Sequence, residues 1–138
     1  MKAPASVAAK VRQRAGDRCE FCLMSQSLQG ASFHIEHILP SIHGGETALQ
    51  NLALACPGCN LHKSDRTQAK DPFNGQMVLL FHPRKHSWDE HFVWSGFRLE
   101  AKTSEGRATV ALLKLNHPRR LLIRKAEQGF GLFPPTIH

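Results

Sequence analysis

Short apolar segments and turn-forming residues alternate in the first half of the chain. Two apolar segments, residues 33–39 and 51–55, are separated by a proline and a glycine pair within residues 40–45. Because proline and glycine interrupt regular structure, this pattern predicts two antiparallel strands joined by a long loop. Pro57 follows the second segment and suits the first turn of a helix, which we expect from residue 58 to about residue 69. The order strand, loop, strand, helix indicates an α+β fold.

A helix is also expected at the start of the chain. Pro4 suits its first turn, Val7 and Val11 share a face at helical spacing, and Gly16 suits its end. The same stretch lacks the apolar centre of a secretory signal, while its small and basic residues leave a short transit peptide as an alternative. We expect a cytoplasmic protein.

The second half of the chain has weaker signals. A turn is predicted at residues 71–75, strands at residues 77–81 and within 88–99, and a helix at residues 118–128. Residues 106–115 are compatible with either a helix or a strand. The prediction for this half is therefore a strand-and-helix extension.

Size and charge limit the class of protein. With 138 residues the chain fits one domain, and 41% hydrophobic content is enough for one core. Eighteen lysines and arginines against eleven aspartates and glutamates give a net charge of +7. This charge favours a polyanionic partner such as a nucleic acid, against the simpler alternative of a merely basic protein. No apolar run approaches the roughly 18 residues of a membrane span, so no membrane partner is expected.

The cysteines form two C-x-x-C pairs, which are Cys19 with Cys22 and Cys56 with Cys59. In a chain without a secretion signal, such pairs indicate zinc rather than disulfides. Four thiolates complete a tetrahedral structural site. The first pair would then be fixed to the start of the helix that follows Pro57.

A carboxylate and an imidazole lie side by side at Glu36 and His37. An imidazole with a pKa near neutrality can take a proton from water, and a metal ion can neutralise a phosphate and assist a leaving oxygen. Adjacent strand residues point to opposite faces, so the two serve one site only where the strand bends or ends. Pro40 favours such a bend, and the following helix can place Asn60 opposite them.

Together these motifs resemble the HNH endonuclease family, in its small bacterial type. The resemblance covers about fifty residues, from Arg14 to Asp65. It rests on Cys19-x-x-Cys22, Glu36-His37-Ile38-x-Pro40, Gly44-Gly45, Asn51-Leu52, Cys56-x-x-Cys59-Asn60 and Lys63. It implies a ββα-metal core, treble-clef-like, stapled by a four-cysteine zinc site. We therefore expect one nuclease domain over residues 1–138, with its core at 12–70 and the extension at 71–138.

The resemblance also implies roles for individual residues. His37 is the expected general base that activates water, and Glu36 and Asn60 are the expected ligands of a catalytic divalent ion. Asn51 is expected to support the loop through side-chain hydrogen bonds. Glutamate stands at 36 where many family members have aspartate, and asparagine at 60 is a neutral oxygen ligand. Such a pair suits Mg²⁺ or Mn²⁺ better than zinc, so we expect two different metals.

Further residues are candidates for phosphate binding, each against the alternative of an ordinary polar side chain. Lys63 lies three residues after Asn60 and so on its side of a helix, whereas His62 points away from it. The full set of candidates is Lys63, His62, His34, Arg84 and Lys85. Arginines and a lysine also place positive charge on the predicted last helix, at Arg119, Arg120, Arg124 and Lys125.

The predicted function is metal-dependent hydrolysis of phosphodiester bonds in DNA, with RNA left open as a substrate. The alternative is a zinc-stapled nucleic-acid-binding or adaptor module without catalysis. Glu36, His37 and Asn60 distinguish the two hypotheses, because an adaptor needs none of them. Strandedness, the biological pathway and the choice between monomer and homodimer are left open.

Overall fold

The computed structural model describes residues 3–136 as a mixed α+β fold with small two-stranded sheets. The helices are α1 (Ala5–Ala15), α2 (Pro57–Lys63), α3 (Trp88–His91), α4 (Ser104–Leu112) and α5 (Pro118–Gly129). The strands are β1 (His34–His37), β2 (Leu52–Ala55), β3 (Gln68–Lys70), β4 (Met77–Leu79), β5 (Phe92–Ser95) and β6 (Arg98–Ala101). Short 3₁₀ helices cover Gln26–Leu28, Ser41–His43 and Leu49–Asn51.

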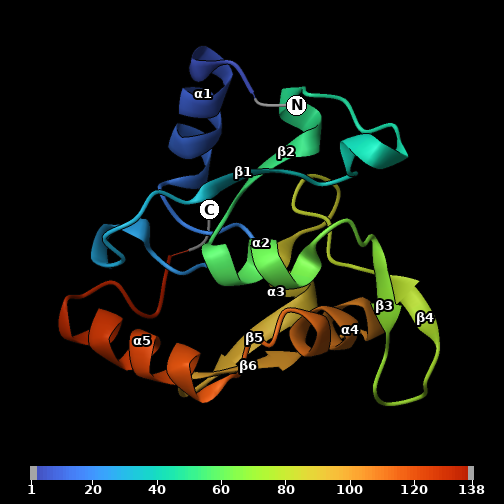
Figure 1. Ribbon diagram of the computed structural model, residues 1–138. Helices are drawn as coiled ribbons and strands as arrows, with labels where there is room; N and C mark the ends of the chain where they lie inside the picture. Colours follow the sequence, from blue (N-terminus) through green and yellow to red (C-terminus); the bar gives the residue numbers. More distant parts are fainter. Residues whose placement is uncertain (1–2, 137–138) are drawn as a thin grey trace.

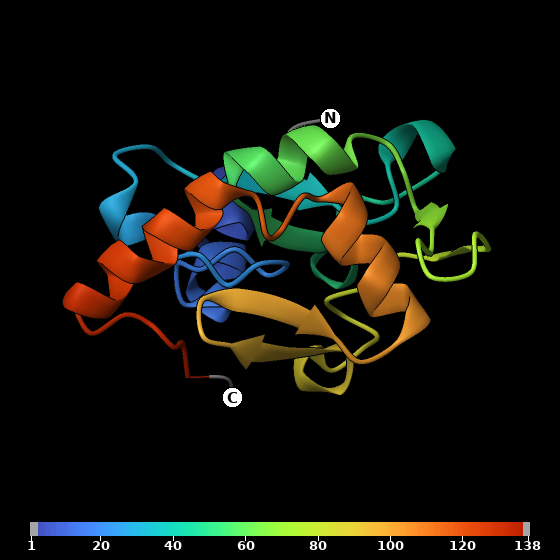
Figure 2. The same cartoon turned by 90° about the horizontal axis from the view of Figure 1, so that it is seen from below.

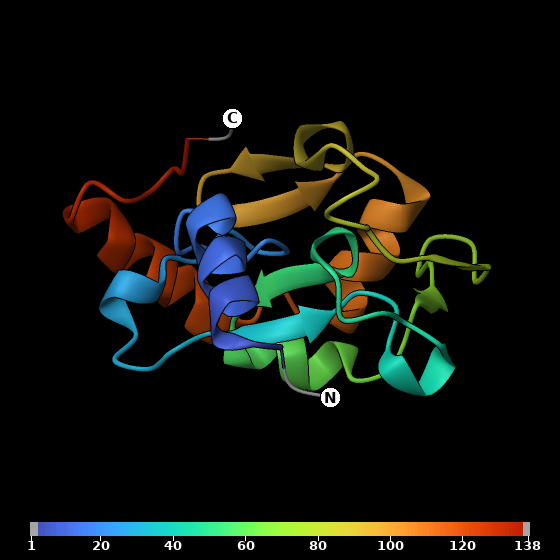
Figure 3. The ribbon, with the colours of Figure 1, turned by 90° about the horizontal axis from the view of Figure 1, so that it is seen from above.

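The β1–β2 hairpin and α2 form the ββα unit that the sequence predicts. The two strands are antiparallel, with His34 opposite Ala55 and His37 opposite Leu52. All four residues of β2 are buried, because α1 lies on one side of the hairpin and α2 on the other (Figure 1). Seen from above, α1 crosses in front of β2 (Figure 3). Because His37 pairs with Leu52, the long loop between the strands lies at the end of the hairpin where β1 finishes.

Helix α2 is shorter than predicted. The sequence suggested a helix as far as Ala69, but the helix ends at Lys63 and Ser64 adopts a positive φ of 50°. Ala69 instead pairs with Val78 in the β3–β4 hairpin. No proline or glycine marks this end, so the sequence offered no local signal for it.

The extension contains a hairpin where one strand was expected within residues 88–99. A four-residue helix, α3, precedes β5, and β5 turns back into β6 at Gly96, which has a φ of 61°. The ambiguous residues 106–115 are mainly helical, in α4. Helix α4 packs on β6 and on the β3–β4 hairpin. Figure 2 shows α4, α5 and the β5–β6 hairpin together, with α1 behind them.

One cluster of buried apolar side chains draws on both halves of the chain. Its members include Val11, Phe21, Phe33, Leu52, Leu54, Phe81, Trp88, Phe92, Leu99, Leu113 and Leu115. The extension is thus packed against the ββα unit rather than around a large core of its own. Among residues 3–136, no helix has the length and apolar character needed to cross a membrane.

Candidate metal centre and active site

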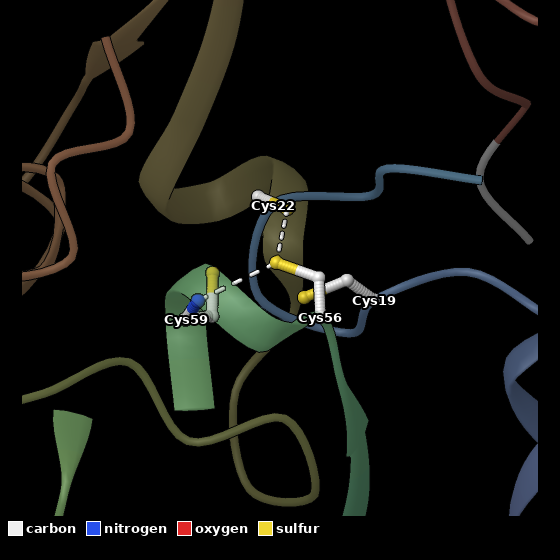
Figure 4. Close-up of side chains that lie close together, drawn as sticks. All are labelled: Cys19, Cys22, Cys56 and Cys59. Atoms are coloured by element: carbon white, nitrogen blue, oxygen red, sulfur yellow. Dashed lines mark hydrogen bonds between the residues drawn. The ribbon is translucent and has the colours of Figure 1, made fainter. Parts of the chain in front are cut away.

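The four cysteines converge at one buried point. Their Sγ atoms all lie within 4.8 Å of one another, and each side chain is at most 3% exposed. A tetrahedron of Zn–S bonds near 2.3 Å places its sulfurs about 3.8 Å apart, and the Sγ atoms of Cys22 and Cys56 are 3.7 Å apart. Figure 4 shows one pair on the loop after α1 and the other at the start of α2. The cluster fits a zinc-type metal site, as predicted.

The thiols of this cluster differ in how readily they lose a proton. Hydrogen bonds with the thiols of Cys19, Cys22 and Cys59 lower the pKa of Cys56 far below that of an ordinary thiol. Burial raises the pKa of Cys19 and Cys59. Because metal ligands must be thiolates, a bound cation would draw the remaining protons from the cluster.

Arg120 of α5 donates hydrogen bonds to this cluster, which the sequence did not predict. Its Nη1 lies 3.6 Å from the Sγ of Cys56 and its Nη2 lies 3.5 Å from the Sγ of Cys59. Burial opposes the charge of Arg120, but the cysteines raise the pKa of the guanidinium above its ordinary value. Gly58 permits the approach, since a Cβ there would lie 2.8 Å from Nη2 of Arg120. A buried cation thus lies beside a site that would carry net negative charge with zinc bound.

The buried face of α5 is charged rather than apolar. Arg120, Arg124 and Glu127 are all at most 7% exposed, whereas Leu122 is 68% exposed. Arg124 donates to the carbonyls of Phe97 and Leu115, and Glu127 accepts from the backbone N–H of Ser25. Two of the four cationic residues predicted to charge the surface of this helix are therefore internal, and only Arg119 and Lys125 are exposed.

Glu36 is buried beneath α2, where it meets Lys63. The Nζ of Lys63 lies 3.5 Å from Oε1 of Glu36 and donates to the carbonyl of Ile38 at 3.0 Å. Lys63 is 2% exposed, so the simple alternative of a solvated lysine is wrong. Burial raises the pKa of Glu36 and lowers that of Lys63, while each charge opposes the shift of the other.

The second carboxylate oxygen of Glu36 has no partner. Oε2 is buried and makes no hydrogen bond to any of the residues that the structure describes. A buried polar atom without a partner is costly, and such atoms in native proteins point to a ligand, an ion or water. The donor chemistry fits a hard divalent ion, for which a carboxylate oxygen is a preferred ligand.

His37 ends β1 and contacts the loop rather than α2. Its Nε2 lies 2.8 Å from Oγ1 of Thr47, a residue that the sequence gave no reason to select. Burial lowers the pKa of His37, and the positive charge of Lys63 lowers it further. The imidazole is therefore neutral at neutral pH, as a general base must be.

Asn51 braces the loop between the strands through its side-chain amide. Its Oδ1 accepts from the N–H of Leu39 at 2.8 Å, and its Nδ2 donates to the carbonyls of Leu39 and Glu46. Gly45 allows the loop to lie against Leu39, because a Cβ at position 45 would lie 1.7 Å from the carbonyl oxygen of Leu39. These contacts are the kind that the predicted supporting role of Asn51 requires.

The remaining candidates are spread over different surfaces. Asn60 lies on α2 one turn before Lys63 and is partly buried, whereas His62 lines a separate cavity of about 380 Å³ beside α5. His34 is exposed at the start of β1. Arg84 forms an ion pair with Glu20, whose other oxygen accepts from the N–H of Leu54. The structure thus brings Glu36 and Lys63 together but not His62 or His34 with them.

These features define a ββα fold with a four-cysteine cluster that fits a metal site, and with a buried carboxylate, Glu36, in the first strand of its hairpin. Residues 19–66 match the family model described as HNH endonuclease, which confirms the predicted resemblance over this segment. Neither the curated proteins nor the solved structures compared with the chain gave a match. The family implies a nuclease-like function and a nucleic-acid substrate.

Proposed function

We propose that the chain is an endonuclease that hydrolyses phosphodiester bonds of DNA with the help of a divalent ion. The observation that carries the proposal is the buried Oε2 atom of Glu36, which lacks a partner within the segment that matches the HNH family. Glu36 directly precedes His37, whose imidazole has a lowered pKa. A purely structural hairpin gains nothing from this combination, because an unpaired buried oxygen reduces stability.

His37 serves as the general base through Nδ1. When Nε2 carries the proton it donates to Oγ1 of Thr47, and Nδ1 then presents a free lone pair to water. Thr47 fixes the ring orientation, and its hydroxyl can accept from Nε2–H in this tautomer. A proton taken from the attacking water thus goes to Nδ1 of a ring that is neutral beforehand.

Glu36 and Asn60 would hold the divalent ion, through Oε2 and through the amide oxygen. Lys63 supports this assignment, because it shares a face of α2 with Asn60 and its Nζ reaches Glu36. When bound, Mg²⁺ or Mn²⁺ neutralises the phosphate and stabilises the leaving oxygen. Lys63 binds Oε1 of Glu36 and so directs Oε2 toward the ion.

The alternative hypothesis, a non-catalytic zinc-stapled adaptor, requires the cysteine cluster and the net charge of +7 but not the Glu36 site. DNA as the substrate, a monomeric or homodimeric state and a cytoplasmic location stay predictions from the sequence.

A plasmid-nicking assay with Mg²⁺ or Mn²⁺ tests the proposal. We expect nicking by the native chain and its loss in His37→Ala, with circular dichroism and zinc content unchanged. His43→Ala is the matched control, since His43 is an exposed histidine outside the candidate residues. Asn60→Ala should require more divalent ion for the same rate. If His37→Ala cuts as fast as His43→Ala, His37 is not the base; if the native chain never cuts any nucleic acid, the adaptor hypothesis is favoured.

A further inference from the structure

A cavity of about 280 Å³ lies where the ββα unit meets the loop of residues 82–86 in the extension. Ile38 and Leu39, which follow β1, line one part of it, and Lys63 at the end of α2 lines another. We call it the loop cavity. Lys63 also binds Glu36, so the loop cavity adjoins the carboxylate of the proposed active site.

The polar side chains of the loop cavity are all hydrogen-bond donors, and none of its lining residues is acidic. They are Lys63, Thr67, His82, Lys85 and His86. Lys85 is exposed, and the imidazoles of His82 and His86 are partly buried. Nζ of Lys63 is already engaged by Glu36 and the Ile38 carbonyl, so the charge that can attract an anion to this cavity comes from Lys85.

The backbone of the loop determines which histidine nitrogen can donate. Nδ1 of His82 accepts from the N–H groups of Arg84 at 3.1 Å and Lys85 at 3.2 Å. Nδ1 of His86 accepts from the N–H of His82 at 3.0 Å. In a neutral imidazole the other nitrogen then carries the proton, so each ring offers Nε2–H as a donor. Burial, and after it the charge of Lys85, lowers the pKa of His82, which favours the neutral form of its ring.

The opposite side of the cavity is apolar and open to solvent. Leu39 is 41% exposed and Leu79 is 58% exposed. A nucleotide matches both sides of the cavity, because its phosphate is anionic and its sugar can pack against apolar side chains. A nucleic-acid strand therefore matches this cavity better than a small inorganic anion, which would leave Leu39 and Leu79 without contact.

We propose that the loop cavity binds a backbone phosphate of the nucleic-acid strand, with Lys85 supplying charge and the Nε2–H groups of His82 and His86 supplying hydrogen-bond donors. The extension would then hold the strand next to Glu36. The inference rests on the proposed function only for the identity of the ligand, because binding through this cavity does not require cleavage.

The test measures binding without divalent ions, by fluorescence anisotropy of labelled single-stranded and duplex oligonucleotides from about 50 to about 200 mM salt. Lys85→Ala should reduce the slope of log affinity against log salt by about 0.7 for a single strand and about 0.9 for a duplex. The affinity deficit of this variant should thus shrink about threefold across the range. Lys125→Ala is the matched control, because Lys125 is an exposed lysine of α5 outside the cavity.

A second variant tests the Nε2–H donor of His82. In His82→Asn the amide oxygen can still accept from the backbone N–H groups of Arg84 and Lys85, so the turn is kept while Nε2–H is lost. Binding should weaken at every salt concentration without a change in slope. Circular dichroism and zinc content confirm that both variants remain folded.

Equal slopes for Lys85→Ala and Lys125→Ala, or unchanged affinity in His82→Asn, would overturn the inference. Titration with inorganic phosphate alone provides a further arm. If phosphate shifts the imidazole NMR signals of His82 and His86 while Lys85→Ala leaves the oligonucleotide slope unchanged, the cavity takes free phosphate and not a strand. If Lys85→Ala lowers the salt slope but the native chain never nicks DNA, this inference stands and the proposed function fails. If the native chain nicks DNA but Lys85→Ala leaves the slope unchanged, the proposed function stands and this inference fails.

Discussion

The cysteine cluster and the Glu36 site differ in how completely their polar atoms are satisfied. The four Sγ atoms surround one point within 4.8 Å of one another, and Arg120 donates to two of them from outside. At the second site Lys63 contacts one oxygen of Glu36, and the other oxygen has no partner among the described residues. The cysteine cluster thus offers a full set of four sulfur ligands, whereas Oε2 of Glu36 is left for a group that we propose to be a divalent ion.

Under the proposed function, this difference separates a structural centre from a reactive one. A structural zinc site is closed by four protein ligands, whereas a catalytic ion keeps positions open for water and substrate. Helix α2 connects the two sites, because Cys56 and Cys59 fix its start while Asn60 and Lys63 follow within about two turns. The cysteine cluster thus orients the helix that carries Asn60 and Lys63, on which the proposed ion site depends.

The largest expected effect comes from opening the closed site. Cys56→Ala removes one of four thiolates, and structural zinc contributes about 10–16 kcal/mol of apparent binding free energy to folding. Because whole domains are stable by only about 5–15 kcal/mol, we expect loss of both zinc and the folded ββα unit. Metal analysis and circular dichroism measure this, with His62→Ala on the same helix as the control. A folded, zinc-free Cys56→Ala protein would contradict the structural role.

A smaller effect is expected from breaking the Glu36 site. Lys63→Met leaves the buried carboxylate of Glu36 without its cation, which typically costs about 3–5 kcal/mol of unfolding free energy. Glu36→Gln combined with Lys63→Met should recover most of that loss, because no buried charge then lacks a partner. Urea unfolding of the two single variants and the double variant measures the coupling between the sites. Strictly additive losses would show that the pair does not interact.

The same experiment has an expected pH dependence. Burial raises the pKa of Glu36, and Lys63 opposes that shift, so removal of Lys63 should raise the pKa further. A carboxyl group with a pKa higher in the folded than in the unfolded state favours folding when it is protonated. The destabilisation in Lys63→Met should therefore decrease as the pH falls and Glu36 takes up a proton. An equal loss at neutral and acidic pH would exclude this cause.

The sequence predicted the features that depend on neighbouring residues. Gly16 ends α1 in the left-handed region, Pro57 lies in the first turn of α2, and the hairpin follows the two apolar segments. The cysteine spacing predicted the metal cluster, because two C-x-x-C pairs have few other uses in such a chain. The glycine, the proline and the apolar segments act on residues close in the sequence, and the cysteines are recognised by their affinity for metal.

The features that the sequence did not predict depend on packing between distant elements. The buried face of α5 carries Arg120, Arg124 and Glu127, so two of the cations expected to charge this helix are internal. Lys63 is buried because Glu36 and the Ile38 carbonyl receive its charge, which no local pattern could indicate. The reversal at Gly96 does have a local signal, because Ser95-Gly96 is a turn-forming dipeptide within the predicted strand.

The smallest of the three effects concerns the arginine outside the closed site. Arg120→Met keeps much of the side-chain volume but removes the donors to Cys56 and Cys59 and the cation that balances their charge. Partners that hydrogen-bond to metal ligands typically contribute about 10–100-fold to metal affinity, so zinc should transfer faster to a competing chelator by a comparable factor. Arg119→Met is the matched control, since Arg119 is exposed on the preceding position of the same helix. Arg120→Lys should restore the charge but only part of the affinity, because one ammonium cannot reproduce the planar fork that reaches two sulfurs. If Arg120→Met and Arg119→Met release zinc at the same rate, the cysteine cluster is complete without α5, and the extension contributes packing to that site but no electrostatic support.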